Sequence, residues 1–232
     1  MSRVKSFWNK EYKEAEHLAL SMNPSGDLID FTRWYEKEFG LGIFEHVRVL
    51  DIGCGNGRNS IFLAKEFNAK GLGFDISKEA VVLAKKAMGK NPPFSFVPGD
   101  IASPLPAEDG TIGLVLDLMV SHCLADKERE LYLKELVRVL EPGGVVLWKS
   151  FLKEGDYHTT QLLRKHGLSG EKNSYIHPTL GGHEHVWTED AFREFVDPYF
   201  TVEVFKRSPG FKRSGDVKTA KRRSFVAYLV KK

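Results

Sequence analysis

The sequence is poor in cysteine and in long apolar segments. Two cysteines among 232 residues are too few for the disulfide framework on which small secreted domains depend. No run approaches the roughly 18 consecutive apolar residues of a membrane-spanning helix. The N-terminal stretch MSRVKSFWNKEYKEAE carries charges where a signal peptide requires an apolar core. These absences favour a soluble, cytoplasmic protein over a secreted or membrane-spanning one.

Two nucleotide-binding patterns are also missing from a glycine-rich stretch, VLDIGCGNGRNS (49–60). It has no lysine at the place where a Walker A loop requires one. Its glycines, Gly53, Gly55 and Gly57, follow the spacing G-x-G-x-G, whereas a dinucleotide fingerprint needs its third glycine one residue later. A Walker A loop is therefore excluded, and a nicotinamide-dependent oxidoreductase is only a weak alternative.

The sequence does contain a regular alternation of short apolar runs and amphipathic stretches. Hydrophobic residues make up 42% of the chain, enough for a sizeable core, and the alternation predicts an α/β fold with helices covering a parallel sheet. A loop without a helical pattern joins the last two runs, so we expect these two to pair antiparallel. The result is a seven-stranded, mostly parallel sheet with one reversed strand near an edge. The seven runs are 47–52, 71–76, 94–99, 111–119, 144–151, 199–205 and 224–230.

Acidic residues follow the ends of the first three predicted strands. Asp51 precedes the first glycine by two residues, Asp75 ends the second strand, and Asp100 follows the third. The carboxyl ends of parallel strands share one edge of a sheet, so we expect these acids to line one pocket. Asp51 would repel a pyrophosphate but suits an ammonium group, Asp75 suits the hydroxyls of a ribose, and Asp100 suits an adenine amino group. S-adenosylmethionine, a nucleoside with a positively charged end, fits this set.

Four stretches together resemble the motifs of a known family. VLDIGCGNGRNS, GFDIS, GDIASPLP and LVRVLEPGGVVLW resemble, in order and spacing, the class I S-adenosylmethionine-dependent methyltransferases over about residues 47 to 151. GCGNGRNS alone also resembles the tellurite-resistance and thiol methyltransferases, a narrower match. The family resemblance implies a Rossmann-like sheet of order 3-2-1-4-5-7-6, with the cofactor across its carboxyl edge.

The resemblance also implies roles for individual residues. The glycines would let the backbone approach the methionine part of the cofactor, Asp51 would help to hold its amino end, and Asp75 would bind its ribose. An N-terminal helical lid (1–40) would bring an aromatic face to the sulfonium, whose charge favours contact with aromatic rings. The predicted cofactor-binding residues are Asp51, Gly53, Cys54, Gly55, Gly57, Arg58, Asp75, Ile76, Asp100, Ile101, Asp117, Leu118, Trp8 and Tyr12.

The acceptor side of the site has weaker signals. His122 follows the fourth predicted strand, and a histidine there suits removal of a proton from the acceptor; the alternative is a packing role. The segment 152–187, which we interpret as a substrate-side insertion of one domain (1–232), carries five of the eight histidines. Gly181-Gly-His-Glu-His invites a metal interpretation, but such a cluster needs further ligands of defined geometry, so no metal is predicted.

The last 27 residues are basic. Residues 206–232 contain ten lysines or arginines and one acid, a net charge of +9, whereas the rest of the chain carries about −6. Such a segment is either solvated surface or attracts a carboxylate, a phosphate or an RNA backbone. The residues concerned in the connection 208–223 are Lys212, Arg213, Lys221, Arg222 and Arg223.

The preferred interpretation is an enzyme that methylates O, N or S of a small molecule, with an anionic acceptor among the candidates. No Asn-Pro-Pro-Tyr-type tetrapeptide follows the fourth strand, where the sequence is Asp117-Leu-Met-Val; this argues against the common base amino-group methylases. An RNA or protein methyltransferase that uses the basic connection, and a non-catalytic binding module, remain as alternatives.

Overall fold

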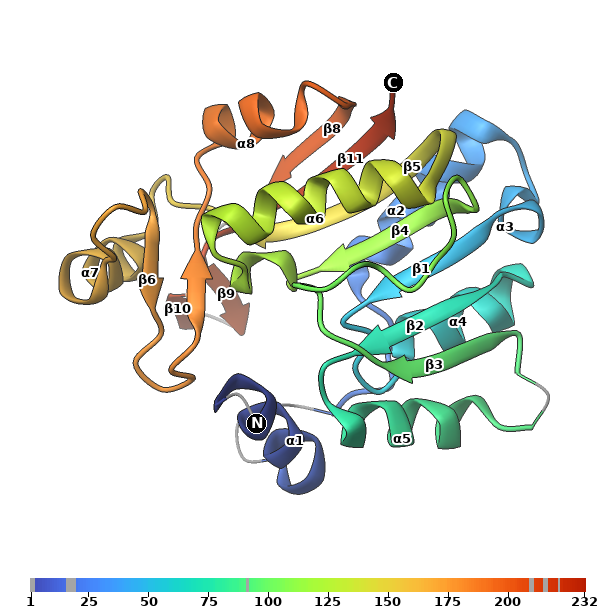
Figure 1. Ribbon diagram of the computed structural model, residues 1–232, viewed down its shortest axis with the longest axis horizontal. Coiled ribbons are helices and arrows are strands. Elements are labelled where there is room, and N and C mark those ends of the chain that lie inside the picture. Colours follow the sequence, from blue (N-terminus) through green and yellow to red (C-terminus); the bar gives the residue numbers. More distant parts are fainter. Residues whose placement is uncertain (1–2, 16–19, 91, 209–210, 215–216, 221) are drawn as a thin grey trace.

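A seven-stranded sheet forms the centre of the fold in the computed structural model (Figure 1). The structure describes residues 3–15, 20–90, 92–208, 211–214, 217–220 and 222–232. The sheet order is β3-β2-β1-β4-β5-β11-β8; counted along the chain among these seven strands alone, it is the predicted 3-2-1-4-5-7-6. The strands are β1 Arg48–Ile52, β2 Lys70–Asp75, β3 Phe94–Pro98, β4 Ile112–Leu118, β5 Leu140–Phe151, β8 Phe200–Arg207 and β11 Ser224–Lys231.

One strand of the sheet is reversed. β11 pairs antiparallel with both β5 and β8, whereas β1, β2, β3, β4 and β5 pair parallel. β8 therefore runs in the same direction as β5, and the connection after it starts at the carboxyl edge. The predicted single reversed strand is confirmed.

Helices cover both faces of the sheet. Apolar residues of α6 and α8 pack in one core cluster, and those of α2, α3, α4 and α5 pack in the other. The helices are α1 Arg3–Glu14, α2 Gly26–Phe39, α3 Ile43–His46, α4 Arg58–Phe67, α5 Lys78–Met88, α6 Asp126–Val139, α7 Tyr157–His166 and α8 Glu189–Val196, with a 3-10 turn η1 at Ser121–Cys123. None of these helices, in the part of the chain that the structure describes, is long and apolar enough to cross a membrane.

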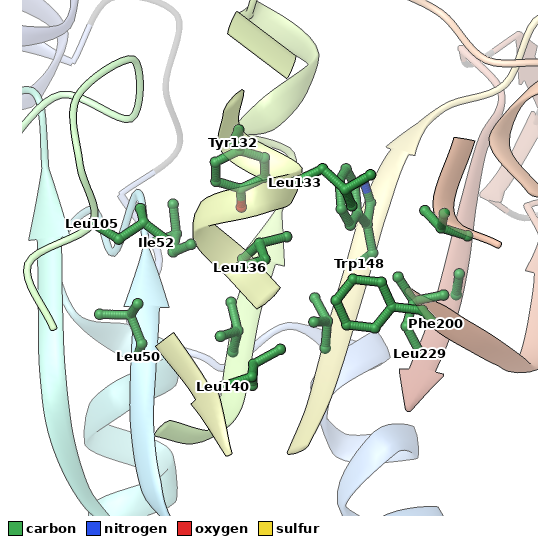
Figure 2. Packing of buried hydrophobic residues seen from close by; sticks show 14 of the residues in the cluster. Leu50, Ile52, Leu105, Tyr132, Leu133, Leu136, Leu140, Trp148, Phe200 and Leu229 are labelled. Carbon is green, nitrogen blue, oxygen red and sulfur yellow. The ribbon is translucent and has the colours of Figure 1, made fainter. Parts of the chain in front are cut away.

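Alternation along the strands supplies both core clusters. Leu50 and Ile52 of β1 face the α6 side, whereas Val49 faces the other, because successive side chains of a strand point to opposite faces. On the α6 side, Tyr132 and Trp148 are fully buried and their rings meet edge-on at 5.8 Å (Figure 2). Burying a large apolar side chain stabilises a fold by about 1.5–3 kcal/mol, so the two core clusters hold the strand ends in fixed register.

The structure adds two hairpins that the sequence interpretation treated as loops. Within 152–187, α7 is followed by the antiparallel pair β6 Ser174–Ile176 and β7 His183–His185, and after β8 come β9 Phe211–Ser214 and β10 Val217–Ala220. Helix α6 has Ala125 as its N-cap residue, and the N–H of Ala125 donates to the carboxylate of Glu128.

The carboxyl edge of the sheet is where these additions gather. The arrows of β1, β2, β3 and β4 point toward the side on which α1 and the β6–β7 hairpin lie (Figure 1). In open α/β sheets, ligands bind in the crevice outside the carboxyl ends of the strands. This edge is therefore the place to look for a functional site.

Candidate active site

A cavity of about 440 Å³ lies at this edge, within the size range of small-ligand sites. Its walls come from α1, the glycine turn after β1, and the ends of β2, β3 and β4. Twelve of the fourteen predicted cofactor residues line it. They are Trp8, Tyr12, Asp51, Gly53, Cys54, Gly55, Arg58, Asp75, Ile76, Asp100, Ile101 and Leu118.

The glycine turn needs its glycines for space as well as for backbone conformation. Gly53 and Gly55 have φ of +61° and +56°, values that residues other than glycine rarely adopt. A Cβ at Gly53 would lie 2.4 Å from Val120, and one at Gly55 would lie 2.5 Å from the Tyr12 hydroxyl. Both positions therefore let neighbouring elements approach the turn closely.

Asp51 is almost fully buried, with 2% of its surface exposed. Its Oδ2 accepts a hydrogen bond of 2.6 Å from the Ser60 hydroxyl at the start of α4. Burial, opposed by the bond from Ser60 and assisted by the nearby charge of Asp75, raises the pKa of Asp51 to about 7. A carboxyl in this state is ready to ionise when a cation arrives.

Asp75 fastens the glycine turn to the next helix. Its Oδ2 accepts from the N–H of Gly55 at 3.0 Å, and its Oδ1 accepts from the N–H of Ser77 at 2.8 Å. Burial raises the pKa of Asp75, and these two backbone bonds act in the opposite direction. The carboxylate is thus held in one orientation beside the turn, at the end of β2, where a ribose is expected.

The charge of the cavity is negative. Its described lining contains the carboxyl groups of Asp51, Asp75, Asp100 and Glu128, and Arg58 is the one lysine or arginine among these described residues. Asp100 is exposed and its Oδ1 accepts from the N–H of Ala102 at 3.0 Å. Coulomb attraction in such a site favours a cationic ligand over a pyrophosphate.

Helix α1 closes one side of the cavity. Val4, Trp8 and Tyr12 all line it, as expected for residues four apart on one helix face. Burial, followed by the charge of Asp75, raises the pKa of Tyr12 well above its usual value. The Ser77 hydroxyl donates to Oδ1 of Asn9 at 2.9 Å, so α1 is attached to the same turn that holds Asp75.

Two predicted cofactor residues do not line the cavity. Asp117 is fully buried, and its carboxylate accepts from the Tyr132 hydroxyl at 2.9 Å and from the N–H groups of Val120 and Ser121 at 3.2 Å each. It shapes the loop after β4, because all these donors lie in that loop or on α6. Gly57 is the N-cap residue of α4.

The predicted base, His122, also lies outside the cavity lining. The residue is 8% exposed, and its ring packs edge-on against Phe151 at 5.0 Å. Burial lowers the pKa of His122 to about 4. Its neighbour Cys123 does line the cavity, with Sγ 3.6 Å from Nε2 of His122, and burial raises the pKa of that thiol to about 12. His122 is therefore next to a lining residue without itself lining the cavity, and its role as a base stays a prediction.

Several lining residues were missed from the sequence. Asn56 and Asn59 line the cavity and connect the segment before α2 to the glycine turn. Nδ2 of Asn56 donates to the Ser21 carbonyl at 3.1 Å, and Oδ1 of Asn59 accepts from the Ser25 N–H at 3.0 Å. Both belong to the polar run after the glycines, which was the available signal. Cys123, Met119 and Glu128 had no comparable pattern.

Two histidines of 152–187 have partners within that segment. His183 Nε2 lies 2.6 Å from Glu171, and His185 Nδ1 lies 2.9 Å from the Ser174 hydroxyl. Within the described ranges, no group of three or more potential ligands is arranged to hold a metal ion.

The basic connection is partly engaged within the fold. Arg222 pairs with Glu184 and donates to the Tyr175 hydroxyl at 2.8 Å, and Arg223 Nη1 donates to the Glu154 carbonyl at 3.0 Å. The side chains of Lys212, Arg213 and Lys221 lie outside the described residues.

Comparison with known proteins agrees with this geometry. Residues 49–144 match the family model described as a methyltransferase domain. These residues contain the glycine turn and all three strand-end acids of the cavity. The matched stretch is therefore similar to methyltransferase domains.

Individual relatives differ in what they act on. The chain is 31% identical over 145 residues to a phthiotriol/phenolphthiotriol dimycocerosates methyltransferase of Mycobacterium ulcerans, covering 62% of this chain and 52% of that protein. It is 26% identical over 196 residues to a tRNA N(3)-cytidine methyltransferase of Danio rerio, covering 80% and 51%. The chain thus spans about half the length of these relatives.

A solved structure shows the same fold over nearly the whole chain. It is a 1,6-didemethyltoxoflavin-N1-methyltransferase of Burkholderia thailandensis with bound 1,6-didemethyltoxoflavin and S-adenosylhomocysteine, with a TM-score of 0.70 and 17% identity. The alignment covers 99% of this chain and 87% of that one. At this identity the likeness establishes the fold, including the strands outside the family-model match.

Proposed function

We propose that the cavity binds S-adenosylmethionine and that the protein transfers its methyl group to O, N or S of a small molecule. The observation that carries the proposal is the pair of buried carboxyls, Asp51 and Asp75, on either side of a turn that a Cβ would block. Buried carboxyls need partners that satisfy their charge. The ammonium group and ribose hydroxyls of this cofactor are such partners.

Each part of the cofactor has a matching group in the wall. Asp51 would hold the ammonium group and Asp75 the ribose, with Ile76 and Ile101 beside the adenine and Asp100 at its amino group. Trp8 and Tyr12 would present aromatic rings to the positive charge, a contact worth about 0.5–2 kcal/mol. The two rings lie 6.4 Å apart on the face of α1 that covers the cavity.

Bound S-adenosylmethionine supplies a methyl group on a sulfonium: the acceptor's lone pair forms a bond to that carbon, the carbon–sulfur bond breaks, and its electron pair stays on sulfur. The chain's own residues fix the donor and exclude water. Such positioning contributes up to about 7–11 kcal/mol in favourable cases. A base is needed only for an acceptor that carries a proton at neutral pH.

The size and closure of the cavity support a small acceptor. Its volume lies within the range of small-ligand sites, and α1 covers it. An anionic acceptor would depend on the cations of the connection 208–223, since Arg58 is the one cationic side chain in the described lining.

The second candidate is an RNA acceptor. It is favoured by the basic connection, which starts at the same edge as the cavity, and by the tRNA-modifying relative. Neutralising Lys212 and Arg213 would then weaken a salt-sensitive association with RNA.

One experiment separates these candidates. Purified protein is incubated with methyl-labelled S-adenosylmethionine and cell extract, and the products are separated into small molecules, RNA and protein. We expect label in the small-molecule fraction. Label in RNA or in protein would overturn the proposed acceptor class, and cofactor binding without transfer to any fraction would favour a binding module.

A further inference from the structure

The turn between β6 and β7 is organised by one histidine. Nδ1 of His177 accepts hydrogen bonds from the N–H groups of Thr179 at 3.3 Å and Leu180 at 3.2 Å. The backbone of His177 also closes the turn, donating to the Gly182 carbonyl at 2.9 Å and accepting from the Gly181 N–H at 2.8 Å. Nδ1 accepts only when it carries no proton, so this conformation requires the neutral ring with its proton on Nε2.

The N-terminal end of α1 rests on this turn. A Cβ at Gly181 would lie 2.6 Å from Nε of Arg3, and a Cβ at Gly182 would lie 2.7 Å from Cγ2 of Val4. Val4 also lines the cavity, together with Trp8 and Tyr12 on the same helix face. In Figure 1, α1 lies between the β6–β7 hairpin and α5, and the bond between Asn9 and Ser77 attaches it at the N-terminus of α5.

We propose that His177 is a positioning residue. It organises the turn 177–182, the seat of α1, and by holding α1 over the cavity it controls how tightly the cofactor is bound. This inference rests on the proposed function, because it assigns the cofactor to the cavity that α1 covers. His177 acts through α1 and does not need to contact the cofactor.

Protonation of His177 should disrupt the seat and so release α1 from the turn 177–182. The ring's Nε2 lies 4.0 Å from Glu184, and the other charged or titratable groups that act on it are Arg222, His158, His166 and His122. Burial lowers the pKa of His177; Glu184 acts against this, whereas Arg222 and the histidines of α7 act with it. The seat is therefore intact at neutral pH, and it is lost as pH falls below about 6.5 toward the lowered pKa.

Asparagine offers a matched rescue. Its side-chain oxygen occupies the position of Nδ1 and accepts from the N–H groups two and three residues ahead, as in an Asx turn, but it does not titrate. His177→Asn should therefore keep the seat at every pH, and His177→Ala should lose it. His158→Asn, on the exposed side of α7, is the control that removes a nearby histidine without touching the turn.

The first measurement needs no cofactor. Hydrogen exchange of the α1 amides (3–14) at pH 7.5 should be on the order of tenfold faster in His177→Ala and unchanged in His177→Asn and His158→Asn. Equal exchange in His177→Ala and the wild type would overturn the inference, as would equally fast exchange in the asparagine and alanine variants. If His177→Ala does not fold, the pH comparison below decides.

The second measurement is S-adenosylhomocysteine affinity by calorimetry between pH 5 and pH 8. The wild type and His177→Asn should bind equally at pH 8, and the wild type should become about five- to tenfold weaker than His177→Asn at pH 5. Asp51 titrates in both proteins, so it cancels in this ratio. A constant ratio would refute the role of His177. Absence of binding by the wild type at every pH would refute the proposed function. The hydrogen-exchange data would still test whether His177 holds α1 in place.

Discussion

Replacing Asp51 by asparagine should make the unliganded protein more stable and the cofactor complex weaker. The carboxyl is buried, and its pKa is raised from 3.8 to about 7. Keeping it ionised in the fold at pH 8 costs on the order of 4 kcal/mol. Asparagine avoids this cost, and its oxygen still accepts the bond from the Ser60 hydroxyl.

The sign of the pH dependence follows from the direction of the pKa change. The folded-state pKa of Asp51 lies above the unfolded value, so its contribution favours folding below about pH 4 and is lost as pH rises through 7. Between pH 5 and pH 8, the wild type should therefore lose about 3 kcal/mol of unfolding free energy relative to Asp51→Asn. Urea denaturation of both proteins at the two pH values measures this difference.

Binding should change in the opposite sense. The proposed ammonium partner favours ionised Asp51, so at pH 8 the asparagine variant should lose about 1.5–3 kcal/mol of cofactor affinity, the value of a hydrogen bond to a charged group. Wild-type affinity should also fall nearly tenfold for each pH unit below 7, and that of Asp51→Asn should fall far less. A variant that binds as tightly as the wild type at pH 8, or that is less stable there, would refute this account of Asp51.

Three further substitutions test neighbouring parts of the site. Asp75→Ala should weaken cofactor binding about 10- to 150-fold, and unchanged affinity by calorimetry would count against the ribose assignment. Tyr132→Phe should lower the unfolding free energy by about 1–3 kcal/mol, because Asp117 loses one of its three donors, while cofactor affinity stays the same; urea denaturation with a parallel titration decides. His122→Ala should reduce turnover less than about tenfold, because the ring lies outside the cavity lining and its pKa is about 4. A loss of 10²–10⁴-fold, the range of a general base, would restore His122 as the catalytic base.

The cofactor half of the site was predictable because it follows from local patterns. The glycine spacing and the acids at successive strand ends depend only on where each strand stops, and parallel topology brings those ends together. Asp51 and Asp75 therefore line the cavity as expected. Asp117 carried the same signal, an acid at a strand end, but the Tyr132 hydroxyl and two backbone N–H groups satisfy its carboxylate inside the fold.

The acceptor half depends on contacts between segments far apart in the sequence. The sequence left Arg222 either as solvated surface or as a contact for an anionic ligand. In the structure it pairs with Glu184, a partner 38 residues away in a hairpin that has only three residues per strand. His177 showed no pattern at all, because its bonds are to the backbone of its own turn. Periodicity and spacing carry no information about such pairings.

The most direct test of the central claim is calorimetric titration of the purified protein with S-adenosylmethionine at pH 8, alongside Asp75→Ala and with NAD as a comparison ligand. We predict saturable one-to-one binding of S-adenosylmethionine that is weakened at least about tenfold in Asp75→Ala, and no binding of NAD. Tight binding of NAD, or binding of S-adenosylmethionine that Asp75→Ala leaves unchanged, would contradict the assignment of this cavity.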